Sequence, residues 1–256
     1  MTGETKKPFN RAGKNLKHIK MKHVSLILSA VVMTAMMLSS CGGGASKEEG
    51  ASAEEGASAE EGASTEEGAS KEVTIGKQVW MTKNLDVDKF QNGDVIPEAK
   101  TEGEWKAYGD AGEAAWCYYD NDRKNGEKYG KLYNWHAVND SRGIAPKGWH
   151  VPTDEEWTIL TDYLGGVEKA GAKMKSKNGW YDNGNGTNSS AFSGLPGGFR
   201  YYNGTFFNFG YNGYWWSSSE LNTYNAWYRL LNFNDGYVYR YDYDKEKGFS
   251  VRCLRD

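Results

Sequence analysis

The chain has 256 residues and a formal net charge of −3, and 14% of its residues are aromatic. All 10 Trp and 17 Tyr lie after residue 73, so we expect the packed core to be built from residues 73–256 alone. That part of the chain has no concentrated basic segment, which excludes a protein that binds nucleic acid by neutralising phosphates.

Residues 1–40 have the composition of a secretory signal peptide. They carry seven Lys or Arg and one Glu, and the basic part is followed by a largely apolar stretch, Val24–Leu38. This stretch is shorter than the roughly 20 residues that a membrane span needs. Met21 is a second candidate start, which would make residues 1–20 a start-site extension. The alternative is a membrane anchor that is never cleaved.

The segment Leu38-Ser39-Ser40-Cys41 resembles a bacterial lipobox, and Gly42-Gly43-Gly44 follows it. This resemblance implies that a signal peptidase cleaves before Cys41 and that lipid is attached to Cys41. A thiolate is the nucleophile in such a step, and two or more acyl chains give stable anchoring. We therefore expect the protein to be anchored by lipid in the outer membrane of the cell envelope and exposed at the surface.

Residues 44–73 repeat with a period of six residues in the pattern GASxEE, and they make up most of the segment 41–72. Residues 41–71 hold eight Glu and two Lys and no large apolar side chain, so the sequence predicts a disordered, extended acidic tether. Acidic residues soon after the lipidated Cys also resemble the outer-face address of some Bacteroidetes-type lipoproteins. The predicted organisation is therefore a leader (1–40), a tether (41–72) and a globular domain (73–256).

The first part of the globular domain contains short β-prone runs. Val73–Ile75 and Gln78–Met81 flank a Gly-containing turn and predict a hairpin. The stretch Trp105–Asn121 is aromatic and irregular, and Asp120–Gly126 is a polar turn. The segment that ends at His136–Val138 is expected to be a strand or a short helix.

The clearest helix signal starts at Thr153. Thr153 and Glu156 have the spacing of a capping box, and the first turn is acidic, which suits the helix dipole. Apolar residues then recur at helical spacing, at Trp157, Leu160 and Leu164. Gly165-Gly166 is expected to end this helix, and a shorter helix is predicted over Val167–Lys175.

The last part of the chain predicts antiparallel strands. The expected strands are Tyr214–Ser218, Ala226–Leu231, Gly236–Tyr243 and Phe249–Leu254. In the third, Tyr237, Tyr239, Tyr241 and Tyr243 alternate and so share one face. Asn234-Asp235-Gly236 is a hairpin turn signal. The predicted fold class is α+β, with one or two helices against short antiparallel strands.

Several segments together resemble one family, the Fibrobacter succinogenes major paralogous domain. The segments are IGKQVWMTKNL (75–85), YGKLYNWHAV (129–138), APKGWHVPTDEEW (145–157), NGW (178–180), SGLPGGFRYYNGTF (193–206), GYWWSSSE (213–220), AWYRLL (226–231) and GFSVRCLRD (248–256). This family occurs in secreted and lipid-anchored bacterial proteins. The capped helix and the terminal segment are also distantly similar to the formylglycine-generating-enzyme branch of C-type-lectin-like folds, which implies a compact, loop-rich domain.

The two cysteines of the domain, Cys117 and Cys253, are an even pair in a compartment that permits disulfides. Two interpretations stay open: a disulfide, or two buried free thiols. These cysteines and His136 and His150 lack the spacing of a metal site, and they form no recognisable nucleophile arrangement. We expect no catalytic residues and no cofactor, and we expect His150 to be a hydrogen-bonded structural residue.

Two further groups are candidate ligand residues. Asp120, Asp122 and Asp182 lie in oxygen-rich loops and are candidates for bound calcium, although neither loop follows the EF-hand register and ordinary turns use the same residues. Trp215 and Trp216 are adjacent on a predicted strand and must point to opposite faces. At least one of them is therefore a candidate for ligand contact at the surface.

The sequence favours a surface-anchored, non-catalytic binding or adhesion module for a glycan or a protein partner. Two alternatives stay open, a structural envelope lipoprotein without a small ligand and an enzyme on a formylglycine-enzyme-like scaffold. The sequence leaves the oligomeric state undefined.

Overall fold

The computed structural model describes residues 71–256. The predicted leader, Cys41 as the predicted lipid-attachment residue and residues 41–70 of the predicted tether lie outside the described residues, so the fold does not test these predictions. Glu72, assigned to the tether, is the first residue of β1. Among the residues that are described, no helix combines the length and the hydropathy needed to cross a membrane.

The domain begins with the predicted hairpin. Strands β1 (Glu72–Ile75) and β2 (Gln78–Met81) pair antiparallel around Gly76, whose φ of 64° suits a residue without Cβ. The last strand of the chain, β11 (Leu254–Arg255), pairs with β2, and β5 (Trp149–His150) pairs with β11. The two ends of the described chain are thus joined in one four-stranded sheet.

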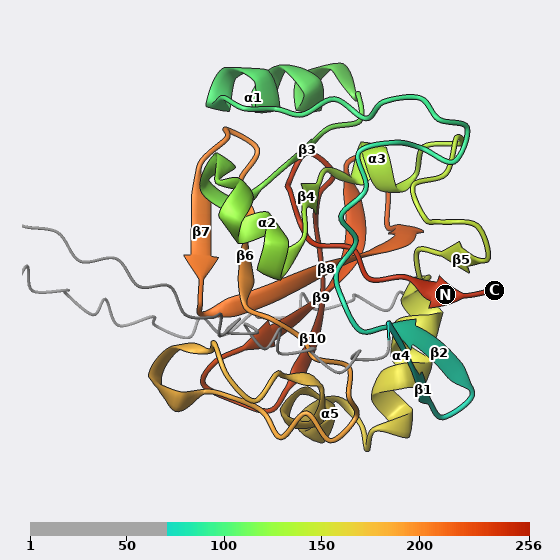
Figure 1. The fold of residues 1–256 in the computed structure, drawn as a ribbon, viewed down its shortest axis with the longest axis vertical. Helices are drawn as coiled ribbons and strands as arrows, with labels where there is room; N and C mark the ends of the chain where they lie inside the picture. The colour runs from blue at the N-terminus through green and yellow to red at the C-terminus, as the bar shows by residue number, and fades with distance from the viewer. Residues whose placement is uncertain (1–70) are drawn as a thin grey trace, which may run out of the picture. The chain divides into compact units, whose positions relative to one another are not determined.

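A five-stranded sheet forms the centre of the domain, in the order β10-β9-β8-β6-β7 (Figure 1). Its strands are β6 (Gly197–Arg200), β7 (Phe206–Phe209), β8 (Asn212–Glu220), β9 (Asn225–Asn232) and β10 (Val238–Asp244). The pairs β10·β9, β9·β8 and β6·β7 are antiparallel, and β6 pairs with β8 in parallel.

Three predicted strands of this sheet, those that became β8, β9 and β10, are confirmed. The β6–β7 hairpin was not predicted, although Asn203-Gly204 between its strands is a turn signal. The predicted strand Phe249–Leu254 is wrong over most of its length. Its residues bridge singly to different partners, Phe249 to Tyr133 and Ser250 to Trp215, because this segment crosses several elements instead of following one neighbour.

Both predicted helices are confirmed, as α4 (Asp154–Tyr163) and α5 (Val167–Met174). The capping box of α4 is complete, because Glu156 N donates to Thr153 Oγ1 at 3.2 Å and Thr153 N donates to Glu156 Oε2 at 2.8 Å. In Figure 1, α5 lies at the opposite end of the domain from α1, with β8, β9 and β10 between them.

The described chain has five α-helices, more than the one or two predicted. The additional helices are α1 (Glu102–Ala111), α2 (Arg123–Tyr129) and α3 (Trp135–Val138). Single 3₁₀ turns, η1 (Tyr119–Asn121) and η2 (Tyr181–Asn183), and a small sheet of β3 (Trp116–Cys117) with β4 (Leu132–Tyr133) complete the fold. The fold class is α+β, as predicted.

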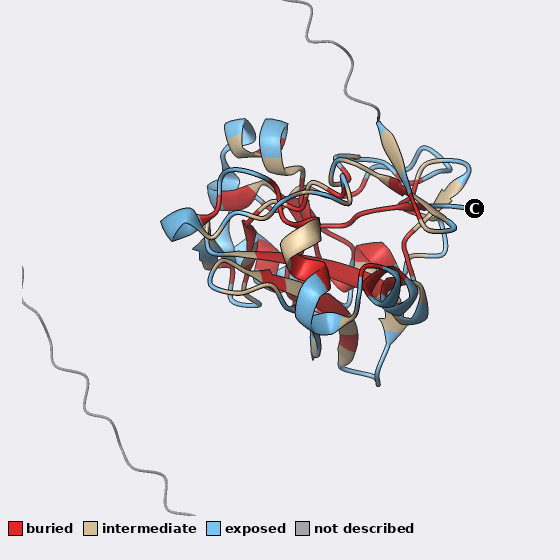
Figure 2. Cartoon of the chain, turned by 90° about the horizontal axis from the view of Figure 1, so that it is seen from below, coloured by how far each residue is buried: buried red, intermediate tan, exposed pale blue. Residues whose placement is uncertain are grey.

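Both faces of the five-stranded sheet are covered, and buried residues occupy the middle of the domain (Figure 2). One face packs against α4, α5 and Phe192 and carries Trp215, Leu231 and Val238. The other face packs against the segment around Phe249 and carries Tyr214, Trp216 and Tyr228. A third cluster lies around Trp105, Cys117 and Leu132.

Candidate functional site

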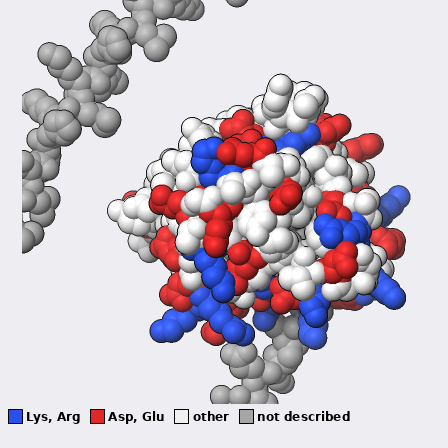
Figure 3. Space-filling model, turned by 90° about the horizontal axis from the view of Figure 1, so that it is seen from above, with Lys and Arg blue, Asp and Glu red and all other residues white. Residues whose placement is uncertain are grey.

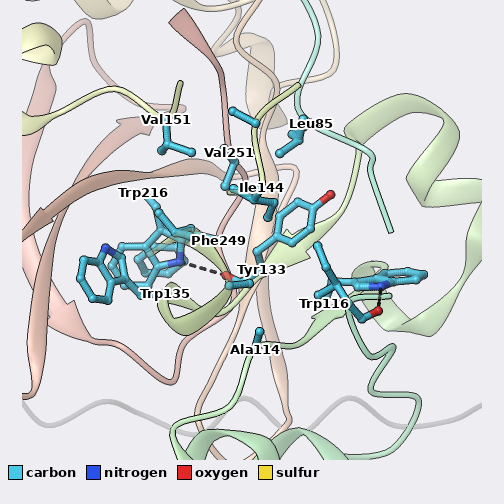
Figure 4. Packing of buried hydrophobic residues seen from close by; sticks show 14 of the residues in the cluster. Leu85, Ala114, Trp116, Tyr133, Trp135, Ile144, Val151, Trp216, Phe249 and Val251 are labelled. Carbon is cyan, nitrogen blue, oxygen red and sulfur yellow. Dashed lines mark hydrogen bonds between the residues drawn. The ribbon is translucent and has the colours of Figure 1, made fainter. Parts of the chain in front are cut away.

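Trp215 and Trp216 point to opposite faces of β8, as predicted, but both side chains are fully buried. Trp215 Nε1 donates to Asn84 Oδ1 at 2.9 Å, and Trp216 Nε1 donates to Tyr133 O at 2.9 Å (Figure 4). The expectation that at least one ring reaches the surface is wrong. It fails because other elements cover both faces of the sheet, so neither ring can contact a ligand.

Cys117 and Cys253 are both buried free thiols, which is the second of the two interpretations that the sequence left open. A disulfide is not formed, because Cys117 lies in the cluster around Trp105 and Cys253 lies in the cluster around Phe249. Burial raises the pKa of each thiol to about 12. At neutral pH both are therefore protonated and poorly nucleophilic.

The calcium candidates have identifiable local roles. Asp122 is the N-cap of α2, where its Oδ1 accepts from Lys124 N at 2.9 Å. Asp120 and Asp182 both have positive φ, at 54° and 49°, within the 3₁₀ turns. Burial and the nearby Asp122 raise the pKa of the Asp120 carboxyl. Within residues 71–256, no group of three or more His, Cys, Asp or Glu is arranged to hold a metal ion.

His150 is hydrogen-bonded at both ring nitrogens, as expected. Nδ1 lies 2.7 Å from Asp256 Oδ1, and Nε2 lies 3.0 Å from Glu156 Oε1. Burial opposes protonation, but the two carboxylates outweigh it and raise the pKa of His150. His150 thus ties β5 to the capping box of α4. His136 lies elsewhere, on α3 beside Lys245, and burial lowers its pKa.

A row of aromatic rings crosses all five strands of the central sheet. In strand order from β7 to β10, the rings are Phe207, Phe199, Tyr214, Tyr228 and Tyr241, with successive ring centroids 4.9–6.2 Å apart. The middle of the row is covered by Phe249, which contacts Tyr214, Tyr228 and Phe199. The two ends are not covered: Phe207 is 46% exposed and Tyr241 is 47% exposed.

The exposed rings at the two ends of the row and the partly buried rings beside them form the aromatic face, which we define as Tyr201, Tyr202, Phe207, Tyr239, Tyr241 and Tyr243. On the β7 side, Tyr201 contacts both Tyr202 and Phe207, with ring centroids 4.4 and 6.0 Å apart. On the β10 side, the ring of Tyr239 is stacked with that of Tyr241 at 5.6 Å, with an interplanar angle of 10°. Tyr202, Phe207, Tyr241 and Tyr243 are all exposed.

Lys247 joins the two halves of the aromatic face from beneath. Its Nζ lies against the ring of Tyr243 and 4.2 Å from the ring centroid of Tyr201. The side chain is fully buried, and within the described part of the chain Nζ has no hydrogen-bond partner. Burial lowers the pKa of Lys247 to about 7. Tyr243 is 39% exposed, so part of its ring can be reached from solvent while Lys247 packs against it.

Charged side chains of both signs are interspersed on the face seen in Figure 3. A surface of this kind offers no broad field of one sign. On this face, the charge distribution therefore does not indicate a ligand of one sign.

The sequence anticipated this face in part. The alternation of Tyr237, Tyr239, Tyr241 and Tyr243 placed these tyrosines on one side of a strand, and the structure stacks the first three with ring centroids 5.6–5.7 Å apart. The contribution of the β6–β7 hairpin was missed. The signal that could have revealed it is the pair of aromatic runs on either side of Asn203-Gly204.

Residues 73–255 match the family described as the Fibrobacter succinogenes major domain. The chain belongs to this family, as the resemblance of its segments predicted. No curated protein and no solved structure matches the chain. The distant likeness to formylglycine-generating enzymes stays a prediction.

Proposed function

We propose that this protein is a lipid-anchored, surface-exposed protein of the outer membrane whose domain is a non-catalytic binding module for a glycan. The leader and Cys41 support the lipid anchor, and the aromatic face supports a glycan as the ligand. The observation that carries the binding role is that two separate hairpins each bring exposed rings to the surface, Tyr202 and Phe207 from one and Tyr241 and Tyr243 from the other. The two groups of rings are linked by buried Lys247, which contacts Tyr201 and Tyr243.

The chemistry of the aromatic face suits a sugar better than an apolar partner. The C–H groups on the flat side of a pyranose ring carry partial positive charge, and they pack against the negative face of an aromatic ring. Five of the six side chains are tyrosines, so each apolar ring also brings a hydroxyl that can donate to or accept from sugar hydroxyls. The buried Lys247 side chain packs against Tyr201 and Tyr243 and restricts the motion of these rings, which lowers the entropy lost on binding.

Glycan binding predicts a large effect of truncating the rings on β10. We expect the full-length chain in non-ionic detergent to bind one class of glycan on a glycan array. The double variant Tyr241→Ala, Tyr243→Ala is expected to weaken that binding at least tenfold, because central aromatic contacts each contribute more than about 1 kcal/mol to such interfaces.

Tyr224→Ala is the matched control, since Tyr224 is 78% exposed and lies outside the aromatic face. It is expected to bind like the parent chain. If the parent chain bound no glycan on the array, glycan binding would be contradicted and the alternative of a structural envelope protein would be favoured. If the double variant and Tyr224→Ala lost glycan affinity equally, the placement of the binding site on the aromatic face would be contradicted.

The anchor is tested separately by Cys41→Ser. We expect this variant to leave the membrane fraction, because serine cannot form the thioether that carries the acyl chains. Protease treatment of intact cells then tests exposure: the parent domain is expected to be cleaved from the surface. A variant that still fractionates with membranes would overturn the lipid anchor, and a domain protected from protease would overturn the surface location.

A further inference from the structure

A second concave site lies away from the aromatic face. A cavity of about 580 Å³ lies among the β1–β2 hairpin, the end of α2 and the loop between α5 and β6. This volume is within the range of small-molecule binding sites. Its charged lining is unusual, because three lysines from three separate segments face it: Lys83 after β2, Lys128 on α2 and Lys177 after α5.

The three lysines have no acidic partner among residues 71–256. None of them takes part in an ion pair there, whereas Lys106, Lys131 and Lys245 each pair with a carboxylate. Glu72 is the one acidic residue in the lining, and it pairs with Arg255. Lys128 extends toward the Lys177 loop, because its Nζ is 3.7 Å from where a Cβ on Gly179 would lie. Lys83, Lys128 and Lys177 are all exposed, so among residues 71–256 the cavity carries more positive than negative charge at its rim.

Part of the cavity lining is a constrained polar segment of the connection between α5 and β6. Asn188, Ala191 and Ser193 all line it, and all have positive φ, at 50°, 57° and 56°. Such a conformation costs an L-residue roughly 1–2 kcal/mol. It is held by two reciprocal bonds: Ser193 N donates to Asn188 Oδ1 at 2.8 Å, and Asn188 Nδ2 donates to Ser193 Oγ at 2.9 Å. The loop is thus a fixed wall and not an adaptable one.

One further polar group is available to a ligand. The side-chain amide of Asn178, which lines the cavity between Lys177 and Gly179, makes no hydrogen bond within the described chain. Most of the lining surface is apolar, and Val73, Ala191 and Leu195 are among its residues. Three lysines, a free amide and this apolar surface are together complementary to a small molecule that joins a negatively charged group to an apolar part.

We propose that this cavity binds a ligand through an anionic oxygen group, a carboxylate, sulfate or phosphate, with Lys83, Lys128 and Lys177 as its cationic partners. Lysine suits this role because an ammonium group contacts such an anion as a point charge from any direction, so all three anion geometries are compatible. The site is independent of the aromatic face and does not rest on glycan binding there.

The test is a titration of the full-length chain in non-ionic detergent with glucuronate, inorganic sulfate and inorganic phosphate, with glucose as the neutral probe. We expect at least one anion to bind and glucose not to bind. Lys177→Gln is expected to weaken the best anion about tenfold, since a charge-assisted bond is lost. The ranking of the three anions identifies which anionic group the cavity prefers.

Lys77→Gln is the matched control, because Lys77 is an exposed lysine outside the cavity and its substitution removes the same charge. It is expected to leave the affinity within twofold of the parent value. Equal effects of Lys77→Gln and Lys177→Gln would overturn the proposal, as would binding of no anion. The double variant Tyr241→Ala, Tyr243→Ala is expected to bind the anion normally, which separates this site from the aromatic face.

Discussion

Arg252→Met is expected to destabilise the domain by about 3–5 kcal/mol, because several buried neutral oxygens lose their donor at once. For a domain of this size, that corresponds to a fall in Tm of roughly 10 °C. The measurement is thermal and urea unfolding of the full-length chain, followed by circular dichroism. Tryptophan fluorescence gives a second probe of the same transition.

The expectation follows from the position of Arg252. The side chain is fully buried, and within the described residues its guanidinium is satisfied by uncharged oxygens alone. Nη1 donates to Met81 O at 3.1 Å and to Phe192 O at 2.5 Å, while Nε and Nη2 donate to Asn84 Oδ1 at 3.1 and 2.7 Å. Burial lowers the pKa of Arg252, which reflects the cost of keeping this cation inside.

The methionine variant removes the arginine donors to these oxygens, and Asn84 Oδ1 keeps its bond from Trp215 Nε1. An unsatisfied buried acceptor costs roughly 1–3 kcal/mol, and Arg252 supplies bonds to three residues that come from distant parts of the chain. Asn84 also accepts from Trp215 Nε1 and donates to Tyr129 O at 2.8 Å. If Asn84 shifts after it loses its bonds to Arg252, its contacts with β8 and with the end of α2 are also weakened.

Arg255→Met is the control for Arg252→Met. Arg255 is exposed and pairs with Glu72, and a surface ion pair of this kind contributes about 0–1 kcal/mol. If the two variants lowered the stability equally, Arg252 would not have the structural role described above.

The buried cations could not be predicted from the sequence. Arg200 and Arg252 are both fully buried, and their partners are distant in sequence. Arg200 bonds Ala99 O and Thr101 O, about a hundred residues earlier, and Arg252 bonds Asn84, 168 residues earlier. A local pattern assigns an arginine to the surface, because burial of a charge is favourable only after the long-range acceptors are in place.

Sequence patterns predicted a helix correctly where the residues that determine it are neighbours in the sequence. The helix α4 was predicted because Thr153 and Glu156 make a capping box within one turn and apolar residues follow at helical spacing. The same capping box exists at Thr101 and Glu104 before α1, with Glu104 N donating to Thr101 Oγ1 at 3.1 Å. That helix was missed because it buries only Trp105 and Gly109, so no apolar stripe marks it in the sequence.

In the candidate site, too, the sequence predicted one property and not another: it gave the direction of side chains but not their exposure. Strand alternation correctly gave the direction of the tyrosines on β10 and of Trp215 and Trp216 on β8. It could not give their exposure, because exposure depends on which other segments cover each face. The segment around Phe249 covers the centre of one face of the sheet and stops short of Tyr241. Trp216 therefore became core and Tyr241 became surface, although both lie on the same side of the same sheet.

Trp216→Ala tests this assignment directly. We expect it to destabilise the domain by about 3–5 kcal/mol, the usual range for removing a large buried aromatic side chain. The ring is fully buried and contacts Phe249 with ring centroids 4.3 Å apart, so the alanine leaves a cavity beneath the segment that crosses the sheet. The variant also removes the donor to Tyr133 O, a carbonyl that still accepts from Phe249 N at 3.1 Å.

Two companion variants make the test specific. Trp216→Phe retains most of the buried area and is expected to cost about 1–2 kcal/mol, mainly for the lost hydrogen bond and the smaller ring. Tyr241→Ala on the aromatic face is expected to change the free energy of unfolding by less than about 1 kcal/mol, because its ring is half exposed. The order Trp216→Ala, Trp216→Phe, Tyr241→Ala in urea unfolding is the expected result. A cost for Tyr241→Ala as large as that for Trp216→Ala would show that the β10 tyrosines are structural, and it would remove the argument for a ligand on the aromatic face.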